Sequence, residues 1–455
     1  ITDFPEKAIP YLRIDKIIEA AKKHKVDAIH PGYGFLSENS DFARRCEEEG
    51  IIFIGAPLKA MVEMGDKINA RTTMIAAGVP VVPGTHENLE TVEQAKKQAE
   101  EIGLPVLFKA SAGGGGMGIR LARTMEEVVD AYTAAKSEAK ANFASDLVYI
   151  EKFIENPHHI EFQIMGDKHG NVIHLCDREC SVQRRHQKVI EESPSPLMTP
   201  ELRKAMGEVA VKAGKAVNYV GAGTIEFMVD NNRNFYFLEM NTRLQVEHPI
   251  TEEVLGLDLV KLQIKVADGQ PLEIKQEDIS QRGHAIECRI CAEDAENNFT
   301  PAPGFIKQLT EPLGIGTRVD SYVYEGYEIP IYYDSMIGKL IVWATNRQYA
   351  IERMRRVLYE YKITGVKTNI SYLRKIMDVP DFVEGHYDTG FLEKNAELLA
   401  GEKTYEASKS EAEDIAILAS YMDYIVNLDE NTSRNGDNRP ISRWREFGKR
   451  AMIRI

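Results

Sequence analysis

Two neighbouring segments decide how this chain is interpreted: Thr224-Ile-Glu-Phe-Met-Val229 and Phe235-Tyr-Phe-Leu-Glu-Met-Asn241. Each places one carboxylate, Glu226 or Glu239, among apolar residues that predict a strand. A buried carboxylate without a partner is costly, so each needs a cation or a metal ion beside it. Asn241 lies on the same strand face as Glu239 and would complete a set of oxygen ligands suited to Mg²⁺ or Mn²⁺. Pairing of each carboxylate with a buried Lys or Arg explains the pattern equally well.

In the residues that follow, Thr242-Arg-Leu-Gln-Val-Glu-His248, polar and apolar side chains alternate from Arg243 to Glu247. In an extended segment, Arg243, Gln245 and Glu247 lie on one side. Such a face suits a small oxyanion acid, because the Arg binds the anion and the Glu takes its proton. A solvated strand edge with a surface ion pair is the alternative. The cationic run Gln183–Lys188 is typical of a solvated face, but beside a nucleotide site it would attract anions.

Farther towards the N-terminus lies the loop Ser111-Ala-Gly-Gly-Gly-Gly-Met-Gly118, which follows a predicted strand ending at Lys109. Consecutive glycines let backbone N–H groups approach phosphates closely. The Lys precedes the loop, so the pattern is neither a Walker A loop nor a dinucleotide fingerprint. A flexible surface loop is the alternative, and the composition favours phosphate binding.

The composition limits the class of protein. A length of 455 residues predicts two to four domains, and 43% hydrophobic with 28% charged residues is ordinary for a globular chain. The 56 basic residues against 70 acidic ones leave a net charge of −14, which argues against a general nucleic-acid binder. No apolar run predicts a membrane span and no secretory signal is evident, so we expect a cytoplasmic protein without membrane contact.

The five cysteines do not predict a disulfide framework, because they are few and odd in number. A zinc site built from Cys176, Cys180, Cys288 and Cys291 is the alternative. The segment Cys288–Cys291 is predicted to be a strand, in which residues three apart point to opposite faces, so this reading is disfavoured.

Periodicity along the chain predicts alternating helices and strands, that is, an α/β fold. Helices are expected over 14–24, 40–49, 91–102 and 125–142. Strands are expected over 51–54, 105–109, 147–153, 161–165, 172–176, 224–229 and 235–240. The opening Ile1-Thr-Asp-Phe-Pro5 predicts that the chain begins partway through a domain.

Seven motifs in a fixed order resemble those of biotin carboxylases, the ATP-grasp components of biotin-dependent carboxylases. They are His30–Asn39, Met64–Lys67, Lys109–Gly116, Ile150–Pro157, Gln183–Lys188, Glu239–His248 and Tyr332–Lys339. The resemblance covers about residues 10 to 395. It implies an enzyme that uses ATP to phosphorylate bicarbonate to carboxyphosphate, which breaks down to CO₂ and phosphate; biotin is then carboxylated at its ureido nitrogen.

The resemblance also implies a role for individual residues. The ATP site would comprise Lys67, Lys109, Gly115, Gly116, Glu151, Lys152, Ile154, His159, Gln183, His186, Glu226 and Glu239. The metal, Mg²⁺ or Mn²⁺, would be held by Glu226, Glu239 and Asn241. Bicarbonate would be bound by Lys188, Arg243, Gln245, Val246 and Glu247, with Glu247 as the base. Biotin would be bound by Tyr33 and Arg318. The catalytic residues would be Lys188, Arg243, Glu247 and Arg318.

The fold implied is α/β ATP-grasp, with an incomplete N-terminal doubly wound domain, a mobile glycine-loop lid and a larger C-terminal α+β domain. The expected boundaries are 1–63 for the N-terminal remnant, 64–82 for a linker, 83–153 for the lid and 154–396 for the C-terminal ATP-grasp domain. Residues 397–455 form an extension that either contacts a partner subunit or packs on the chain's own surface.

The resemblance implies partners as well: a biotin carboxyl carrier protein or domain, a carboxyltransferase subunit and a second copy in a homo-oligomer. No Met-Lys-Met sequence occurs in the chain, so carrier-bound biotin is expected to come from elsewhere. Two other functions remain open: another ATP-grasp ligase that joins a carboxylate to an amine, and a non-catalytic subunit that keeps the fold. The presence of both metal carboxylates and of the base argues against the second.

Overall fold

The computed structural model describes residues 10–85, 88–110, 119–143, 147–400, 417–418 and 420–421, without the side chains of residues 10, 67, 68, 110, 142 and 143. The chain divides into the unit Ile1–Leu399 and the unit Ala400–Ile455. All the helices and strands below belong to the first unit. The glycine loop 111–118 lies outside the described residues, as does the expected C-terminal extension beyond residue 400, apart from the four positions near 420.

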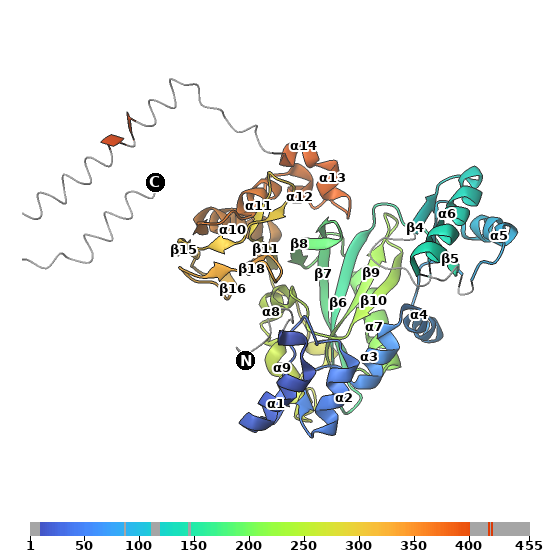
Figure 1. Ribbon diagram of the computed structural model, residues 1–455, viewed down its shortest axis with the longest axis horizontal. Helices are drawn as coiled ribbons and strands as arrows, with labels where there is room; N and C mark the ends of the chain where they lie inside the picture. Colours follow the sequence, from blue (N-terminus) through green and yellow to red (C-terminus); the bar gives the residue numbers. More distant parts are fainter. Residues whose placement is uncertain are drawn as a thin grey trace, which may run out of the picture. The chain divides into compact units, whose positions relative to one another are not determined.

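An eight-stranded antiparallel sheet is the largest element, with strand order β10-β9-β6-β7-β8-β11-β18-β16 (Figure 1). Its strands are β6 His158–Gly166, β7 Val172–Arg184, β8 Gln187–Ser193, β9 Gly221–Val229, β10 Phe235–Asn241, β11 His284–Cys291, β16 Thr317–Ser321 and β18 Met336–Ala344. Three of the expected strands are confirmed within longer ones, at 161–165, 172–176 and 224–229, and the fourth, 235–240, coincides with β10.

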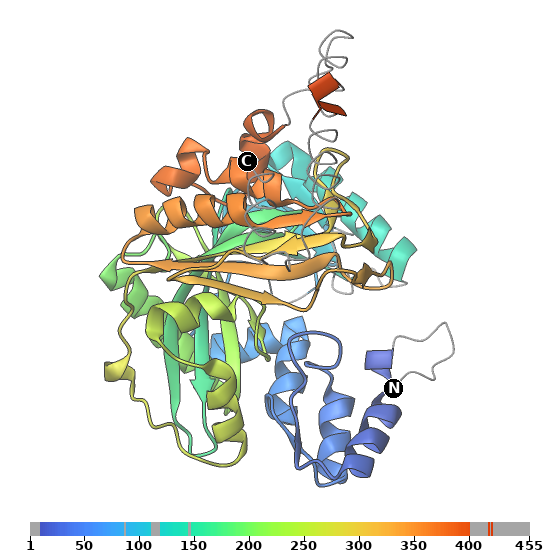
Figure 2. The ribbon, with the colours of Figure 1, turned by 90° about the vertical axis from the view of Figure 1, so that its left-hand side faces the viewer.

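The two faces of this sheet differ because its strands alternate. In β6, Ile160, Phe162 and Ile164 belong to an apolar cluster with helix α7 (Pro200–Ala216). Farther along the same face, β11 and β18 pack against α10 (Arg347–Glu360) (Figure 2).

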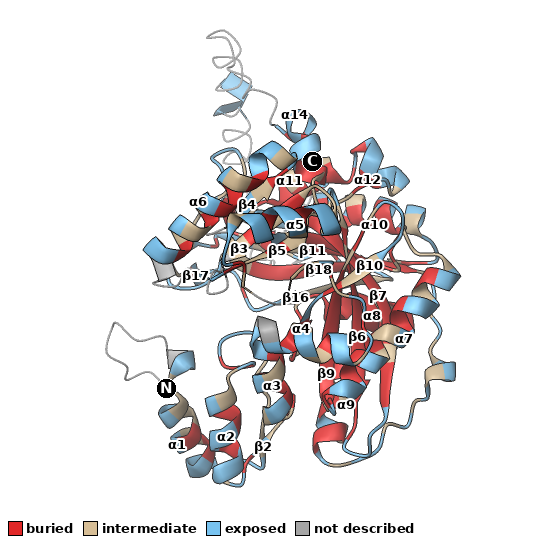
Figure 3. Cartoon of the chain, turned by 90° about the vertical axis from the view of Figure 1, so that its right-hand side faces the viewer, coloured by how far each residue is buried: buried red, intermediate tan, exposed pale blue. Residues whose placement is uncertain are grey.

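The opposite face is covered by α8 (His248–Leu255) and α9 (Leu259–Ala267), which pack on an apolar cluster that includes Met165, Leu244 and Ile341. The middle of this face carries charged side chains instead. We call it the polar face. Figure 3 shows that the strands of the sheet are buried along most of their length, charged residues included.

The N-terminal part contains two parallel strands and four helices. These elements are α1 Ile14–His24, β1 Ala28–Ile29, α2 Ser40–Glu48, β2 Ile52–Phe53, α3 Leu58–Gly65 and α4 Lys67–Ala76, after a 3₁₀ turn at Pro10–Leu12. The predicted helices over 14–24 and 40–49 are confirmed. Helices α3 and α4 pack on the cluster around Phe162 through Met61, Met64 and Met74.

A separate three-stranded sheet, in the order β4-β3-β5, carries two helices and forms its own core. Its elements are α5 Val92–Ile102, β3 Val106–Ala110, β4 Ile119–Ala122, α6 Met125–Phe143 and β5 Val148–Lys152. Phe108 of β3 is fully buried, with its ring 5.8 Å from that of Tyr132 on α6. We call residues 88–110, 119–143 and 147–152 the lid.

Short elements complete the first unit. The strands are β12 Glu293–Asp294, β13 Thr300–Pro301, β14 Gly304–Phe305, β15 Gln308–Thr310, β17 Glu328–Ile329 and β19 Lys362–Thr364. The helices are α11 Ile370–Ile376, α12 Pro380–Glu384, α13 Phe391–Lys394 and α14 Ala396–Leu399, with a 3₁₀ turn at Gln276–Asp278. Among the described helices, none combines the length and the apolar character that a bilayer crossing requires.

Candidate active site

Three carboxylates form a row across neighbouring strands of the polar face. In the strand register, Glu226 of β9 lies opposite Glu161 of β6 on one side and Glu239 of β10 on the other. Directly opposed residues have Cβ atoms about 5 Å apart, so the three side chains are neighbours. Glu226 is buried and Glu239 is exposed, whereas the sequence pattern predicted both on buried strands.

The amide of Asn241 donates to Oε1 of Glu226 at 2.9 Å, which places all three predicted metal ligands together at the end of β10. Their oxygen atoms fit Mg²⁺ or Mn²⁺ by type. His159, Glu161 and Glu226 also have ligand atoms within 4.8 Å of one another, so the described residues offer a further donor beside this set.

Lys188, from the start of β8, lies at the centre of the polar face. Its ammonium contacts Glu161 at 2.6 Å, Glu226 at 3.0 Å and Glu247 at 2.6 Å. Burial would lower the pKa of Lys188, but its anionic neighbours outweigh burial and raise that pKa well above its ordinary value. Lys188 is therefore a permanent cation here. For Glu226, the sequence left open a metal ion or a buried cation as partner, and the structure provides the cation.

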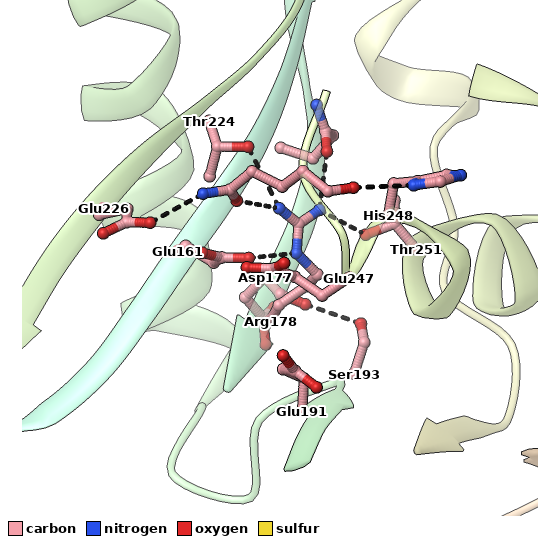
Figure 4. A network of polar contacts seen from close by, with 12 residues as sticks. Glu161, Asp177, Arg178, Glu191, Ser193, Thr224, Glu226, Glu247, His248 and Thr251 are labelled. Atoms are coloured by element: carbon pink, nitrogen blue, oxygen red, sulfur yellow. Dashed lines mark hydrogen bonds and ion pairs between the residues drawn. The ribbon is translucent and has the colours of Figure 1, made fainter. Parts of the chain in front are cut away.

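The fully buried Arg178 of β7 holds the surrounding side chains in place (Figure 4). Its guanidinium is paired with Glu161 and donates to four further side chains. These are Gln163 at 2.7 Å, Thr251 at 3.0 Å, Thr224 at 3.1 Å and Gln245 at 2.9 Å. Because all its N–H groups have partners, Arg178 ties three strands of the sheet to α8 and to the loop before it.

Glu247 precedes α8 and is 2% exposed. Its Oε1 accepts from Lys188, and its Oε2 accepts from Arg289 of β11 at 3.0 Å. Burial would raise the pKa of Glu247, but Lys188, Arg289 and Arg178 outweigh burial and hold that pKa well below its usual range. The carboxylate is therefore ionised and able to accept a proton.

Gln245 joins the same group, since its amide donates to Glu226 at 2.9 Å. Arg243 does not lie with Gln245 and Glu247 as predicted. Residues 242–247 form a connection outside any strand, in which alternation is not maintained. The guanidinium of Arg243 contacts Glu38 at 2.8 Å and the side-chain oxygen of Asn241 at 3.0 Å. It lies at the edge of the group, beside the predicted metal ligands.

A tight turn between β7 and β8 carries the cationic run. Arg185 and His186 both have positive φ, at 51° and 63°, as the favoured two-residue hairpin turn requires. The turn makes Gln183 and Lys188 register partners. Gln183 is half-buried and His186 is exposed at the tip, so of these three predicted residues only Lys188 reaches the carboxylates.

The predicted ATP residues of the lid gather around Glu151 of β5. Its carboxylate contacts Lys109 at 2.5 Å and Arg71 of α4 at 3.1 Å. The side chain of Lys152 points elsewhere, donating to the carbonyls of Leu104 at 2.7 Å and of Gly103 at 3.0 Å. Ile154 is half-buried just beyond β5. Gly115, Gly116 and the side chain of Lys67 lie outside the described residues.

His159 connects the ATP residues to the metal ligands, with Nε2 at 3.0 Å from Oε2 of Glu226. Burial would lower the pKa of His159, but Glu226 outweighs burial and raises it. Glu226 therefore favours the protonated form of His159, which would add positive charge beside the row of carboxylates.

Lys339 of β18 lies between the two predicted biotin residues. Its ammonium is 5.6 Å from the ring centroid of Tyr33 and 3.5 Å from Asp320, which accepts from Arg318 at 2.8 Å. Lys339 also donates to the carbonyl of Val246 at 2.8 Å. Arg318 is bound in addition to Glu252 of α8 at 2.7 Å. Both acids restrict its guanidinium to one orientation.

Sequence reasoning missed Glu161, Arg178 and Arg289. The alternation His159-Ile-Glu-Phe-Gln163 did carry a signal, because it places polar side chains at every second position of a strand. Arg178 and Arg289 each have another charged residue close by in the same strand, but the partners of their guanidinium groups lie up to 98 residues away, so no local pattern identifies these contacts.

Comparison with known proteins finds matches to three family models along the chain. Residues 3–61 match the family described as biotin carboxylase, N-terminal domain, and residues 287–394 match the biotin carboxylase C-terminal domain. Residues 66–275 between them match the ATP-binding domain of the carbamoyl-phosphate synthase L chain.

Curated relatives resemble most of the chain. A biotin carboxylase of Nostoc is 53% identical over 390 residues, 86% of this chain and 87% of the relative. A pyruvate carboxylase subunit of Methanothermobacter thermautotrophicus is 54% identical over 390 residues, 86% of this chain and 79% of the relative.

Solved structures match the same share of the chain, 86%. The biotin carboxylase domain dimer of Hydrogenobacter thermophilus 2-oxoglutarate carboxylase, in complex with MgADP, ADP and bicarbonate, superposes with a TM-score of 0.79. It is 51% identical, covering 86% of this chain and 87% of that one. A Campylobacter jejuni biotin carboxylase in complex with a β,γ-ATP compound is 49% identical, with a TM-score of 0.79 and coverage of 86% and 87%.

Proposed function

The chain belongs to the biotin carboxylase family, and from this membership we propose that it carboxylates carrier-bound biotin with bicarbonate and ATP. The γ-phosphoryl group of ATP passes to bicarbonate and gives carboxyphosphate and ADP. Carboxyphosphate breaks into CO₂ and phosphate, the phosphate takes the proton from the ureido nitrogen of biotin, and CO₂ adds to that nitrogen. The fold is that of an ATP-grasp enzyme.

In this proposal, the nucleotide lies between the lid and the polar face. Lys109 and Lys67 contact phosphates, while Glu151 keeps Lys109 oriented through their 2.5 Å ion pair. Glu226, Glu239 and Asn241 hold Mg²⁺ or Mn²⁺, which when bound neutralises charge on the phosphates. His159 and Lys188 contribute further positive charge on either side of Glu226.

The observation that carries the proposal is the position of Glu247, a buried, ionised carboxylate held between two partly buried cations, Lys188 and Arg289, beside the predicted metal ligands. Bicarbonate must lose a proton to attack, and a general base must lie within hydrogen-bond reach of it. Lys188, Arg243, Gln245 and the backbone of Val246 bind the anion. Lys188 then stabilises the negative charge that bicarbonate gains as Glu247 takes the proton.

Biotin binds between Tyr33 and Arg318. An Arg remains protonated through the reaction, so Arg318 can stabilise the negative charge that develops on the ureido oxygen. The pair of acids around it, Asp320 and Glu252, presents the guanidinium in a fixed direction.

Relatives of the chain are subunits or domains of biotin-dependent carboxylases. We propose a biotin carrier protein and a carboxyltransferase as partners of this chain as well, and a homodimer as its assembly, by analogy with the dimer of the relative.

ATP cleavage, measured with and without bicarbonate and with and without free biotin, tests the proposal. We expect cleavage to require bicarbonate and to be accelerated by biotin. ATP cleavage that does not depend on bicarbonate, or that requires an amine as the substrate joined to a carboxylate, would assign the chain to another group of ATP-grasp ligases. Absence of nucleotide binding would favour a non-catalytic subunit.

A further inference from the structure

One carboxylate of the N-terminal part, Glu38, contacts a proposed bicarbonate residue but has no role in the reaction described so far. It lies between β1 and α2, 204 residues before Thr242. Its Oε1 accepts from the backbone N–H of Thr242 at 2.8 Å and from the hydroxyl of the same residue at 3.2 Å. Its Oε2 accepts from Nε of Arg243 at 2.8 Å. Both oxygens of Glu38 therefore bind the start of the connection 242–247.

Glu38 is itself held by the residues on both sides of it. Leu36 and Ser37 before it are buried. Asn39 after it is the N-cap of α2, and its side chain accepts from the backbone N–H of Phe42 at 2.8 Å. Because its neighbours are fixed, Glu38 can hold a partner side chain in one position rather than follow it.

Arg243 depends on such a partner. Its side chain is 22% exposed and lies outside any strand, so many rotamers are open to it. Its Nε contacts Glu38, one terminal nitrogen donates to the side-chain oxygen of Asn241 at 3.0 Å, and the other donates to the carbonyl of Leu244 at 3.4 Å. These contacts engage three of the five N–H groups of a guanidinium. One N–H on each terminal nitrogen remains, which suits a bidentate contact with a small oxyanion.

From this geometry we propose that Glu38 is a positioning residue of the bicarbonate site. It holds Arg243 so that two N–H groups remain for the anion, and through Thr242 it fixes the start of the connection that leads to Glu247. Glu38 itself contacts neither bicarbonate nor ATP. The link to bicarbonate rests on the proposed function, whereas the contact between Glu38 and the connection does not.

A surface ion pair without effect on the site is the alternative, because such pairs contribute little and the side chain of Glu38 is 40% exposed. Two features argue against it. Thr242, whose backbone N–H binds Glu38, is 3% exposed, so the contact reaches a buried segment. The two oxygens of Glu38 also accept from different residues, and a Gln side chain would offer only one acceptor.

Charge and position predict opposite effects when Glu38 is removed. A carboxylate near an anion site repels the anion, so loss of its charge would by itself strengthen bicarbonate binding. Loss of position would instead release the side chain of Arg243 towards solvent and weaken bicarbonate binding. The direction of the change in KM for bicarbonate therefore separates the two effects.

Steady-state kinetics of bicarbonate-dependent ATP cleavage test the link to bicarbonate. We expect Glu38→Ala to raise KM for bicarbonate about tenfold, as the loss of one charge-assisted hydrogen bond would, and to leave KM for ATP unchanged. Glu38→Gln keeps the shape of the side chain and should change KM in the same direction, so it is the second variant if Glu38→Ala does not fold. An unchanged or lower KM for bicarbonate would overturn the proposal, as would an equal rise of KM for ATP.

A double-mutant cycle tests whether Glu38 acts through Arg243. Arg243→Ala should raise KM for bicarbonate, and the addition of Glu38→Ala should raise it further by about twofold at most. Independent, multiplying effects of the two substitutions would refute the positioning role. Glu48→Ala is the matched control, because Glu48 is an exposed carboxylate of α2 paired with Arg45 at 3.3 Å. Its kinetic constants should be those of the wild type.

Hydrogen exchange tests the contact without any assay of activity. The N–H of Thr242 loses its acceptor in Glu38→Ala, so peptides covering 242–247 should exchange faster, whereas those of β10 should not change. Glu48→Ala should exchange as the wild type does. Unchanged exchange over 242–247 in Glu38→Ala would rule out the proposed contact. A wild type without bicarbonate-dependent ATP cleavage would contradict the proposed function instead, and exchange would still test the contact.

Discussion

At the scale of single residues, the polar face depends on a few partly buried cations that each contact more than one carboxylate. Lys188 contacts Glu161, Glu226 and Glu247, which come from two strands and from the start of α8. Removal of one member of a buried, hydrogen-bonded set leaves an uncompensated charge, at a cost of about 3–5 kcal/mol. Substitutions that keep the shape of a side chain and change only its charge are therefore the informative ones.

Glu247→Gln keeps the shape of the proposed base and removes its ability to accept a proton. Since general-base catalysis contributes about 10²–10⁴-fold, we expect kcat of bicarbonate-dependent ATP cleavage to fall by that factor. The Kd for ATP, measured by calorimetry, should be unchanged, because Glu247 does not lie among the lid residues. Glu360→Gln, at an exposed carboxylate paired with Arg356, is the control. An equal loss of ATP affinity would move Glu247 to the nucleotide site.

At the scale of elements, irregular strand pairing places the predicted metal ligands. In the pairing of β10 with β9, Phe237 lies opposite Phe227, whereas Glu239 lies opposite Glu226. The register shift accommodates Leu238 as an extra residue. Side chains alternate along a strand, so without this bulge Leu238 would face Glu226 and Glu239 would be turned to the other face. One additional residue thus brings two carboxylates together.

Glu239→Ala removes an oxygen ligand from this set. We expect the Mg²⁺ concentration needed for half-maximal nucleotide binding to rise at least about tenfold, equivalent to about 1.4 kcal/mol. Fluorescence titration of a nucleotide analogue at several Mg²⁺ concentrations measures the change. Glu273→Ala, at an exposed carboxylate, is the control, and its nucleotide binding should depend on Mg²⁺ as that of the wild type does. A normal Mg²⁺ titration in Glu239→Ala would refute the metal assignment.

The lid is a second element-level feature, because it has a core of its own. Phe108→Ala removes a fully buried ring that packs on Tyr132, and we expect the free energy of opening of the lid to fall by about 3–5 kcal/mol. Hydrogen exchange should accelerate in β3, β5 and α6 but not in the eight-stranded sheet. Val62→Ala, at an exposed position on α3, is the control. Uniform acceleration over the whole first unit would show that the lid does not open separately.

At the scale of the whole molecule, one sheet connects both halves of the proposed reaction. The predicted metal ligands lie on β9 and β10 at one edge, and Arg318 lies on β16 at the other. Arg289 and Glu247 lie between them, on β11 and before α8. The arrangement separates the residues proposed to activate bicarbonate from the residue proposed to bind biotin.

This separation predicts that the two half-steps can be uncoupled. Arg318→Ala should abolish transfer of ¹⁴C-bicarbonate to a biotin carrier protein added in trans, while slow biotin-independent ATP cleavage persists. Arg44→Ala, at an exposed arginine paired with Asp41, should carboxylate the carrier at the wild-type rate. Carrier carboxylation at that rate by Arg318→Ala would make Arg318 structural. Biotin detected on this chain itself by streptavidin would contradict supply in trans.

Much of this organisation follows from the sequence. Local periodicity located α1, α2, α5 and α6, and the strands β3, β5, β6, β9 and β10, within a few residues, because it records which side of each element is buried. It predicted only the first part of β7, which continues to Arg184, and gave no range for β4, β8, β16 and β18. Ordered motifs identified the family and the ATP-grasp fold, and the comparisons confirm both. The individual roles assigned to Lys67, Gly115, Gly116 and the other site residues remain predictions.

What only the tertiary structure decided is which charges meet. Sequence placed Glu226 beside either a metal or a cation, and the fold brings Lys188 to it across the sheet. It grouped Arg243 with Glu247, whereas the loop before α8 turns Arg243 towards Glu38. No sequence pattern indicated that Glu191, Glu287 and Arg289 lie together on adjacent strands. The reason is that periodicity depends on neighbouring residues, while these contacts depend on strand order, register and single-residue bulges, which join positions far apart in the chain.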